Sequence, residues 1–293
     1  MNKLFAISLT LLIFSQTCKS QNSTYFHKDM LSNNLIQPPS LLTSQDSIYN
    51  DSPYELIGNR EGWILGSGAL LGVTGLVLMS NIQPLTLEEI NQLDPADVNK
   101  FDRHAIGPYR TYKAGDFLLY GSLLLPLTFL SNKEMKRDIK ILGIIGLEVL
   151  LFQAGLNFVV KGISQRIRPY VYDSESGIDK KTSKAAKLSF YSGHTSTTAA
   201  ISFYTAKVFS DYLPDGLTKT LIWTGAIIYP AAVGYLRVAS SNHFPTDVIV
   251  GYSVGALLGY YIPQMHKKDR VEGLSIFPSV EYNYYTLNAV YSF

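Results

Sequence analysis

Residues 234–247 read GYLRVASSNHFPTD and join two apolar segments in the C-terminal half of the chain. His243 and Asp247 are four residues apart in this stretch, which makes them neighbours if the backbone is helical. A carboxylate beside one ring nitrogen of a histidine fixes its tautomer and leaves the other nitrogen free to attack. Pro245 is compatible with a helix that begins here, because the first helical turn tolerates proline. An ordinary helix start with an acid in its first turn explains these residues equally well.

A second cluster precedes this one. Residues 191–196 read YSGHTS and open another apolar segment. A helix that begins at Ser192 would present free backbone N–H groups and the positive end of its dipole to an anion. Gly193 allows close approach of a ligand to the backbone, and His194 could protonate a departing oxygen. A serine N-cap followed by an exposed histidine is the alternative explanation.

A third cluster, residues 161–169, reads KGISQRIRP. Lys161 and Arg168 are seven residues apart, which places them on nearly the same face of a helix that we expect Pro169 to end. Two cations on one face could hold one oxyanion. Cations at the end of an apolar helix can also extend to the membrane surface, and we expect this of Arg166, which points away from that face.

Six apolar segments of helical length predict an all-α fold, a bundle of about six apolar helices. They are Trp63–Met79, Phe117–Leu130, Ile139–Val160, Ser196–Tyr212, Leu221–Leu236 and Val248–Ile262. Several are near the lower limit of about 17–20 residues for a bilayer crossing. The mean hydropathy is only +0.09, so a soluble helical bundle stays open as the alternative.

In chain order the clusters give Lys-x6-Arg-Pro, Ser-Gly-His and Arg-x5-His-x3-Asp, each at the end of an apolar segment. This pattern resembles the tripartite signature of the type 2 phosphatidic acid phosphatase (PAP2) superfamily, which includes class A acid phosphatases and vanadium haloperoxidases. The resemblance covers about residues 63–262. Tyr191 stands where the family usually has proline, and Leu236 where it usually has serine. Both positions shape the site, so the departures bear on substrate fit.

The resemblance implies a role for each matching residue. By this resemblance, the phosphate is bound by Lys161, Arg168, Ser192, Gly193 and Arg237. His243 attacks phosphorus, Asp247 orients it, and His194 protonates the leaving oxygen and then activates water. Three cations replace a metal, so no cofactor is expected. They would also repel a metal ion from a site made of His194, His243 and Asp247.

The function implied is a metal-independent phosphomonoesterase or pyrophosphatase that acts on a lipid phosphate through a phosphohistidine intermediate. Substrates of the phosphatidate, undecaprenyl pyrophosphate or lipid A class fit apolar helices around the site. The alternatives are a soluble periplasmic acid phosphatase of broad specificity, a vanadium-dependent haloperoxidase and a membrane scaffold with a decayed site. A net charge of +2 without a basic block gives no indication of a nucleic-acid partner. The oligomeric state is not readable from the sequence.

The chain divides into four predicted parts. Residues 1–20 have the features of a signal peptide, with Lys3 before an apolar core, and residues 21–60 form a polar arm. Residues 61–268 form the phosphatase domain. Residues 269–293 alternate as a strand does, and we expect a short β-hairpin-like tail. Cys18 lies in this leader and is the only cysteine, so removal of the leader would leave a mature chain without a thiol. A bacterial cell envelope fits best, with the active site facing the periplasm.

The basic clusters and the remaining polar residues give further expectations. Basic clusters at residues 133–140 and 267–270 favour a cytoplasmic location for both. Six crossings after a cleaved leader would give the opposite orientation, a conflict that resolves if Phe117–Leu130 does not span or if the domain is soluble. We expect His27, His104 and His266 at the surface, and residues 102–113 in a solvated loop.

Overall fold

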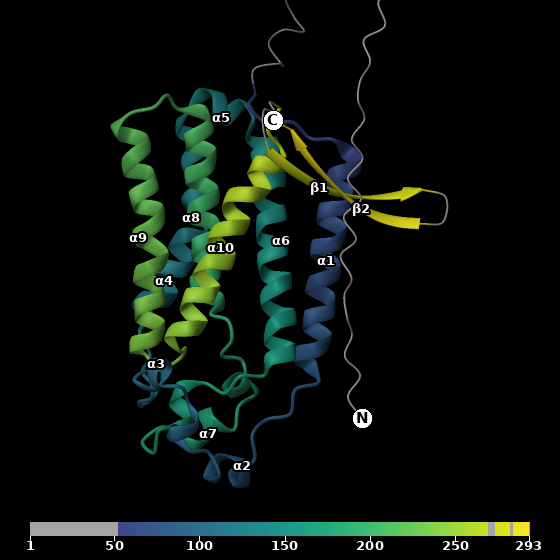
Figure 1. Ribbon diagram of the computed structural model, residues 1–293. Helices are drawn as coiled ribbons and strands as arrows, with labels where there is room; N and C mark the ends of the chain where they lie inside the picture. The colour runs from purple at the N-terminus through teal and green to yellow at the C-terminus, as the bar shows by residue number, and fades with distance from the viewer. Residues whose placement is uncertain (1–51, 269–272, 282–283, 293) are drawn as a thin grey trace, which may run out of the picture. The chain divides into compact units, whose positions relative to one another are not determined.

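The computed structural model describes residues 52–268, 273–281 and 284–292. The predicted signal peptide, most of the polar arm and His27 lie outside these ranges. Long helices dominate the described residues and run side by side (Figure 1), which confirms the predicted helical bundle. They are α1 (Gly58–Ser80), α6 (Ile139–Ser164), α8 (Gly193–Tyr212), α9 (Leu217–Ala239) and α10 (Pro245–Met265).

Shorter elements connect the long helices. The segment predicted as Phe117–Leu130 is α4 (Lys113–Ser122) followed by the 3-10 helix η3 (Leu125–Ser131). One group of short elements gathers at the end of the bundle where α8 and α10 begin (Figure 1). The short elements are α2 (Leu87–Asn91), η2 (Pro95–Asp97), α3 (Lys100–Arg103), α5 (Lys133–Arg137), η4 (Pro169–Tyr172), α7 (Ile178–Lys181) and η5 (Lys184–Lys187).

Helix α8 is the central helix, and 12 of its 20 residues are buried. Glycines every fourth residue on α10 face it. A Cβ added to Gly251, Gly255 or Gly259 would lie 2.7, 2.1 or 2.2 Å from a backbone oxygen of α8 or its N-cap. Small residues at this spacing allow two helix backbones to touch. The first turn of α8 carries His194 and that of α10 carries Asp247, and the two turns are therefore held directly against each other.

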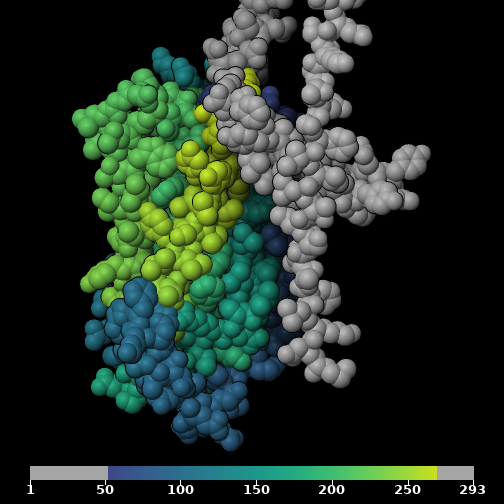
Figure 2. All heavy atoms as spheres, in the orientation of Figure 1, coloured from purple at the N-terminus to yellow at the C-terminus, as the bar shows by residue number. Residues whose placement is uncertain are grey.

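The outer helices present apolar side chains outward. Five segments are long and apolar enough to cross a membrane, namely Gly58–Ser80, Lys113–Ser131, Ile139–Tyr172, Leu217–Ala239 and Pro245–Met265. Leu221 and Tyr235 on α9 and Leu257 on α10 are more than half exposed, and Figure 2 shows these two helices side by side on one face. A soluble protein rarely exposes so large an apolar surface. The protein is therefore membrane-associated.

The C-terminal tail is a two-stranded antiparallel hairpin, as predicted. Strand β1 (Gly273–Glu281) pairs with β2 (Tyr284–Ser292), with Gly273 opposite Ser292 and Glu281 opposite Tyr284.

Two of the expectations for isolated residues differ from the structure. His104 is exposed, as predicted, but His266 is fully buried, so its predicted surface position is wrong. The prediction that residues 102–113 form a solvated loop is also wrong for Asp102, which lies in α3 and has no exposed surface. Both errors have one cause: a charged side chain that pairs with distant residues can be buried, and the local sequence does not show the partner.

Candidate active site

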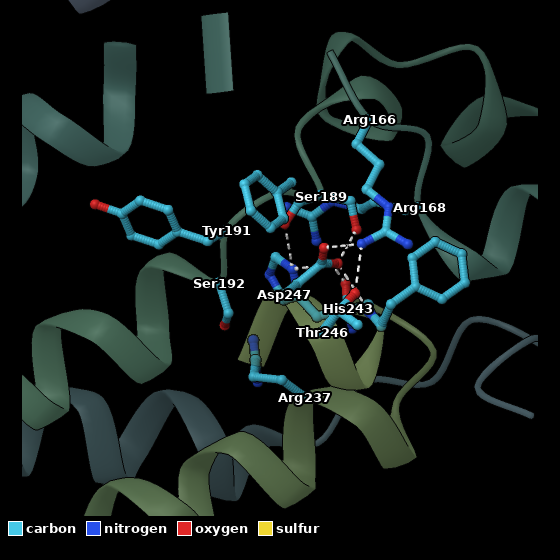
Figure 3. Close-up of polar contacts among 12 residues, drawn as sticks. Arg166, Arg168, Ser189, Tyr191, Ser192, Arg237, His243, Thr246 and Asp247 are labelled. Atoms are coloured by element: carbon cyan, nitrogen blue, oxygen red, sulfur yellow. Dashed lines mark hydrogen bonds and ion pairs between the residues drawn. The ribbon is translucent and has the colours of Figure 1, made fainter. Parts of the chain in front are cut away.

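The predicted site residues lie where several elements end near one another: the end of α6, the start of α8 and the turn from α9 to α10. Figure 3 shows five of them, namely Arg168, Ser192, Arg237, His243 and Asp247. The loop before α8 is joined to α10, because the Ser192 backbone N–H donates to the Asp247 carbonyl at 3.0 Å. The turn is closed by two backbone N–H groups, those of Asn242 and His243, which donate to the Arg237 carbonyl at 3.2 Å each. Backbone contacts thus connect two of the three sequence clusters.

Helix α8 begins as predicted. Ser192 is its N-cap, is fully buried and accepts a hydrogen bond from the Thr195 N–H at 3.5 Å. A Cβ added to Gly193 would lie 3.0 Å from Asn157 Oδ1 and 3.3 Å from Lys161 Nζ. The ammonium group of α6 therefore lies beside the first free N–H groups of α8, which together suit an anion.

The prediction that Lys161 and Arg168 share one helix face is wrong. Helix α6 ends at Ser164, and Gln165 adopts a left-handed conformation with φ 42°. Arg168 is extended, because the ring of the following proline excludes the helical conformation there. Its Nη1 donates to Asn242 Oδ1 at 3.0 Å, which places the guanidinium beside the α9–α10 turn rather than above Lys161 on a helix.

His243 is buried just before α10 begins at Pro245, so it does not share a helix with Asp247 as the four-residue spacing suggested. Its Nδ1 lies 2.7 Å from the Ser189 carbonyl oxygen. Because a carbonyl can only accept, Nδ1 carries the proton and Nε2 presents its lone pair. Burial and then the charge of Arg168 lower the pKa of His243 to about 3, which keeps the ring neutral near pH 7.

Asp247 holds the His243 ring indirectly, through the residues around it. Its Oδ2 is 3.6 Å from His243 Nδ1, longer than a hydrogen bond. The same oxygen accepts from Ser189 Oγ at 2.5 Å and from the Phe244 N–H at 2.8 Å. Asp247 therefore fixes the residues on both sides of the ring, and the direct partner of Nδ1 is a backbone carbonyl.

Arg166 was predicted to point away from the site and instead braces it. Its Nη1 donates to Asp247 Oδ1 at 2.6 Å, and its Nη2 donates to Asp102 Oδ2 at 2.8 Å (Figure 3). The guanidinium also lies 4.3 Å from the centre of the Phe244 ring. Although burial opposes it, hydrogen bonds from Thr246 and Arg166 lower the pKa of Asp102. The prediction failed because the chain leaves the helix before Arg166, so helical spacing does not describe its direction.

His194 pairs with an acid that the sequence signature does not include. Its Nε2 lies 3.0 Å from Asp116 Oδ1 in α4, and Arg237 Nη2 lies 3.3 Å from the same oxygen. Burial and then the charge of Arg237 lower the pKa of His194 to about 4, and the Asp116 carboxylate opposes this shift by stabilising the protonated imidazole. The sequence contained one signal for Asp116, a single acid in the first turn of an otherwise apolar segment.

The structure thus brings the predicted residues to one end of the bundle, linked through Asp116 and the residues around Ser189. Sequence reasoning missed four contributors: Asp102, Asp116, Arg166 and Ser189.

Comparison with known proteins agrees with this arrangement. Residues 142–270 match the family model of the PAP2 superfamily, and this segment contains all eight predicted site residues. This match confirms the resemblance to that superfamily that the sequence motifs indicate.

Two known proteins are similar to the chain. A lipid A 4'-phosphatase from Porphyromonas gingivalis is 26% identical over 137 residues, which cover 46% of this chain and 55% of that protein. The match thus spans about half the length of this relative. The solved structure titled the first transmembrane PAP2 type phosphatidylglycerolphosphate phosphatase from Bacillus subtilis is 22% identical, with a TM-score of 0.33. The match covers 69% of this chain and 98% of the chain in that structure.

Proposed function

We propose that the protein is a phosphatase that hydrolyses a lipid phosphate through a phosphohistidine on His243. The observation that carries the proposal is the state of that ring: Nδ1–H is held by the Ser189 carbonyl, and burial keeps the ring neutral. A neutral imidazole with one fixed N–H is the form that can attack phosphorus.

The phosphoryl group binds among the cations. Lys161 lies beside Gly193 at the start of α8, and Arg168 lies beside Asn242, the residue before His243. Arg237 reaches the same end of the bundle from α9 and is held by Asp116. Transfer of a phosphoryl group depends mainly on position and on neutralising the charge of its oxygens, which these three side chains supply without a metal.

The reaction has two steps. In the first step Nε2 of His243 forms a bond to phosphorus while the ester P–O bond breaks. The leaving oxygen keeps the electron pair of that bond and accepts a proton from His194. In the second step neutral His194 accepts a proton from water, the water oxygen bonds to phosphorus and the P–N bond breaks. Inorganic phosphate leaves, and both histidines regain their starting states. Asp116 supports the protonated form of His194 that the first step needs.

A lipid is the substrate class that suits the surroundings of the site. The site lies at the ends of four apolar candidate spans, those that contain α4, α6, α9 and α10. Between α8, α9 and η3 lies an apolar hollow of about 380 Å³, lined by residues that include Phe209, Leu221, Ile222 and Ala226. An acyl chain attached to a phosphate in the site could occupy it. The name of the Porphyromonas gingivalis relative makes a phosphorylated glycolipid of the lipid A class the first substrate to test.

The active site faces the periplasm in this proposal. The basic side chains of α5 precede α6, and Lys267 and Lys268 follow α10, so both groups lie at the helix ends opposite the site. Basic residues favour the cytoplasmic side of a membrane. The opposite end, with His243, then lies outside the cytoplasm in the cell envelope.

The test is phosphate release by the purified chain in detergent from lipid A, phosphatidate, an isoprenyl pyrophosphate and p-nitrophenyl phosphate. His243→Ala should remove essentially all turnover of every substrate, while His104→Ala, which changes an exposed histidine, should retain it. Radiolabelled phosphate should remain on wild-type protein quenched in alkaline detergent, in an alkali-stable, acid-labile form. Undiminished hydrolysis by His243→Ala would refute the mechanism, and a preference for soluble esters would refute the lipid substrate.

A further inference from the structure

A second cluster of ionisable side chains lies at the other end of the bundle. Glu61 in the first turn of α1, Glu148 within α6 and His266 directly after α10 converge there. His266 Nε2 is 3.0 Å from Glu148 Oε2 and 3.3 Å from Glu61 Oε1. The side chains of His266 and Glu148 have no exposed surface, and that of Glu61 is 9% exposed.

The hydrogen bond of the His266 ring decides which nitrogen faces the acids. Nδ1 lies 2.8 Å from the Ile262 carbonyl oxygen, so Nδ1 carries the proton. In the neutral ring, Nε2 then directs its lone pair at two carboxylates. Although Glu148 Oε2 is near, Nε2 makes no hydrogen bond of acceptable geometry with any described residue. An N–H donated from Nε2 to Glu148 does not explain the contact.

The carboxylates of Glu148 and Glu61 also include oxygens that lack a hydrogen-bond partner among the described residues. Neither carboxylate oxygen of Glu148 has a hydrogen-bond partner within the described part of the chain, and neither does Glu61 Oε2. Arg60 compensates one charge, because its Nε and Nη2 donate to Glu61 Oε1 at 2.9 and 2.8 Å. With a neutral His266 ring, one buried negative charge is left over, and such a charge is very unfavourable unless a cation or a proton joins it.

We propose that Glu61, Glu148 and His266 bind one divalent transition-metal ion, with zinc as the first ion to test. Ligands about 2.0–2.1 Å from a tetrahedral zinc ion lie about 3.3–3.4 Å from one another, close to the two separations observed here. Imidazole nitrogen and carboxylate oxygen are both donors that zinc binds, and three of them leave a fourth position for water. The Nδ1–H bond to a carbonyl and the Arg60 contact to Glu61 orient the ligands from outside, as is usual in metal sites.

The ion would act on stability rather than on the reaction. His266 is 19 residues beyond Asp247, a distance of about 28 Å along a helix. The ligands come from three helices, so the ion would cross-link α1 to α6 and to the end of α10. Helix α1 gains most from this link, because it packs chiefly on α6 and most of its surface faces outward.

The experiment measures metal content and thermal unfolding of the full chain in detergent. After dialysis against Zn²⁺, wild type should hold about one ion per chain, and Glu148→Gln, which keeps the side-chain shape, should hold at least about tenfold less. Glu88→Gln, which changes an exposed acid on α2, is the matched control and should bind as wild type does. Chelation should lower the unfolding temperature of wild type by several degrees and leave that of Glu148→Gln unchanged.

A second measurement covers the case in which Glu148→Gln does not fold. Co²⁺ added to metal-free wild type should give the visible absorption bands of a four-coordinate or five-coordinate site with a nitrogen ligand, and one equivalent of Zn²⁺ should abolish them. The proposal is overturned if wild type binds neither ion, or if Glu148→Gln binds Zn²⁺ as tightly as wild type. His243→Ala should keep its ion in every case, so failure of the proposed phosphatase activity and failure of the metal site are separately visible.

Discussion

The two ends of the helical bundle bury charge in opposite ways. At the active-site end, Lys161, Arg168 and Arg237 are balanced only in part by acids, and the excess is positive. In the cluster around His266 at the other end, two carboxylates, those of Glu61 and Glu148, face the single arginine Arg60, and the local excess is negative. An uncompensated charge inside a protein is unfavourable, so each excess indicates a missing partner of opposite sign. The first end suits a phosphate and the second suits a cation.

The largest expected effect comes from a comparison of two variants, each of which lacks one arginine at one end of the bundle. Arg168→Ala should lower kcat/KM by about 10²-fold to 10³-fold, because the guanidinium neutralises charge that grows in the transition state. Arg60→Ala should leave kcat/KM unchanged and lower the unfolding temperature, because Arg60 holds Glu61 and the carbonyls of Glu55 and Met265. Steady-state kinetics and a thermal melt on both variants test this. Equal kinetic losses in the two would show that the ends are not independent.

A smaller effect should come from Asp116, which acts through His194. Asp116→Asn should slow hydrolysis of an alkyl phosphate about 10-fold to 100-fold, since the alkoxide must be protonated as it leaves. Hydrolysis of p-nitrophenyl phosphate should change little, because its leaving group needs no proton. Asp215→Asn, at a 94% exposed acid side chain before α9, is the control. Equal losses on both substrates would instead assign Asp116 to phosphate binding through Arg237.

The smallest effect concerns the hollow between α8, α9 and η3. No atom lies within 4 Å of a Cβ added to Gly225, so Gly225→Leu can extend into the hollow without disturbing the helices. It should raise the KM of a long-chain lipid phosphate about tenfold and leave that of a soluble ester unchanged. Gly66→Leu on α1, where a Cβ also has open space, is the matched control. An unchanged KM for the lipid would show that the acyl chain lies elsewhere.

Sequence reasoning was strongest where the local pattern determines the structure. The apolar segments predicted the bundle, and the Ser192–Gly193 pair predicted the start of α8. The pattern failed where the chain leaves regular structure. The left-handed turn at Gln165 redirects Arg166 and Arg168, and no spacing rule anticipates it. Asp102, Asp116 and His266 have partners 64 residues or more away in the chain, so their burial follows only from the assembled fold.

The glycines at every fourth residue of α10 also limit how this protein can change. Because the backbones of α8 and α10 are in direct contact, the separation of their first turns is fixed by main-chain dimensions rather than by adjustable side chains. In the proposed lipid phosphatase, substitutions on the outward faces of α9 and α10 would alter which lipid is accepted without shifting either histidine. Substrate preference and catalytic geometry would then be under separate control, and related chains could diverge in the first while they retain the second.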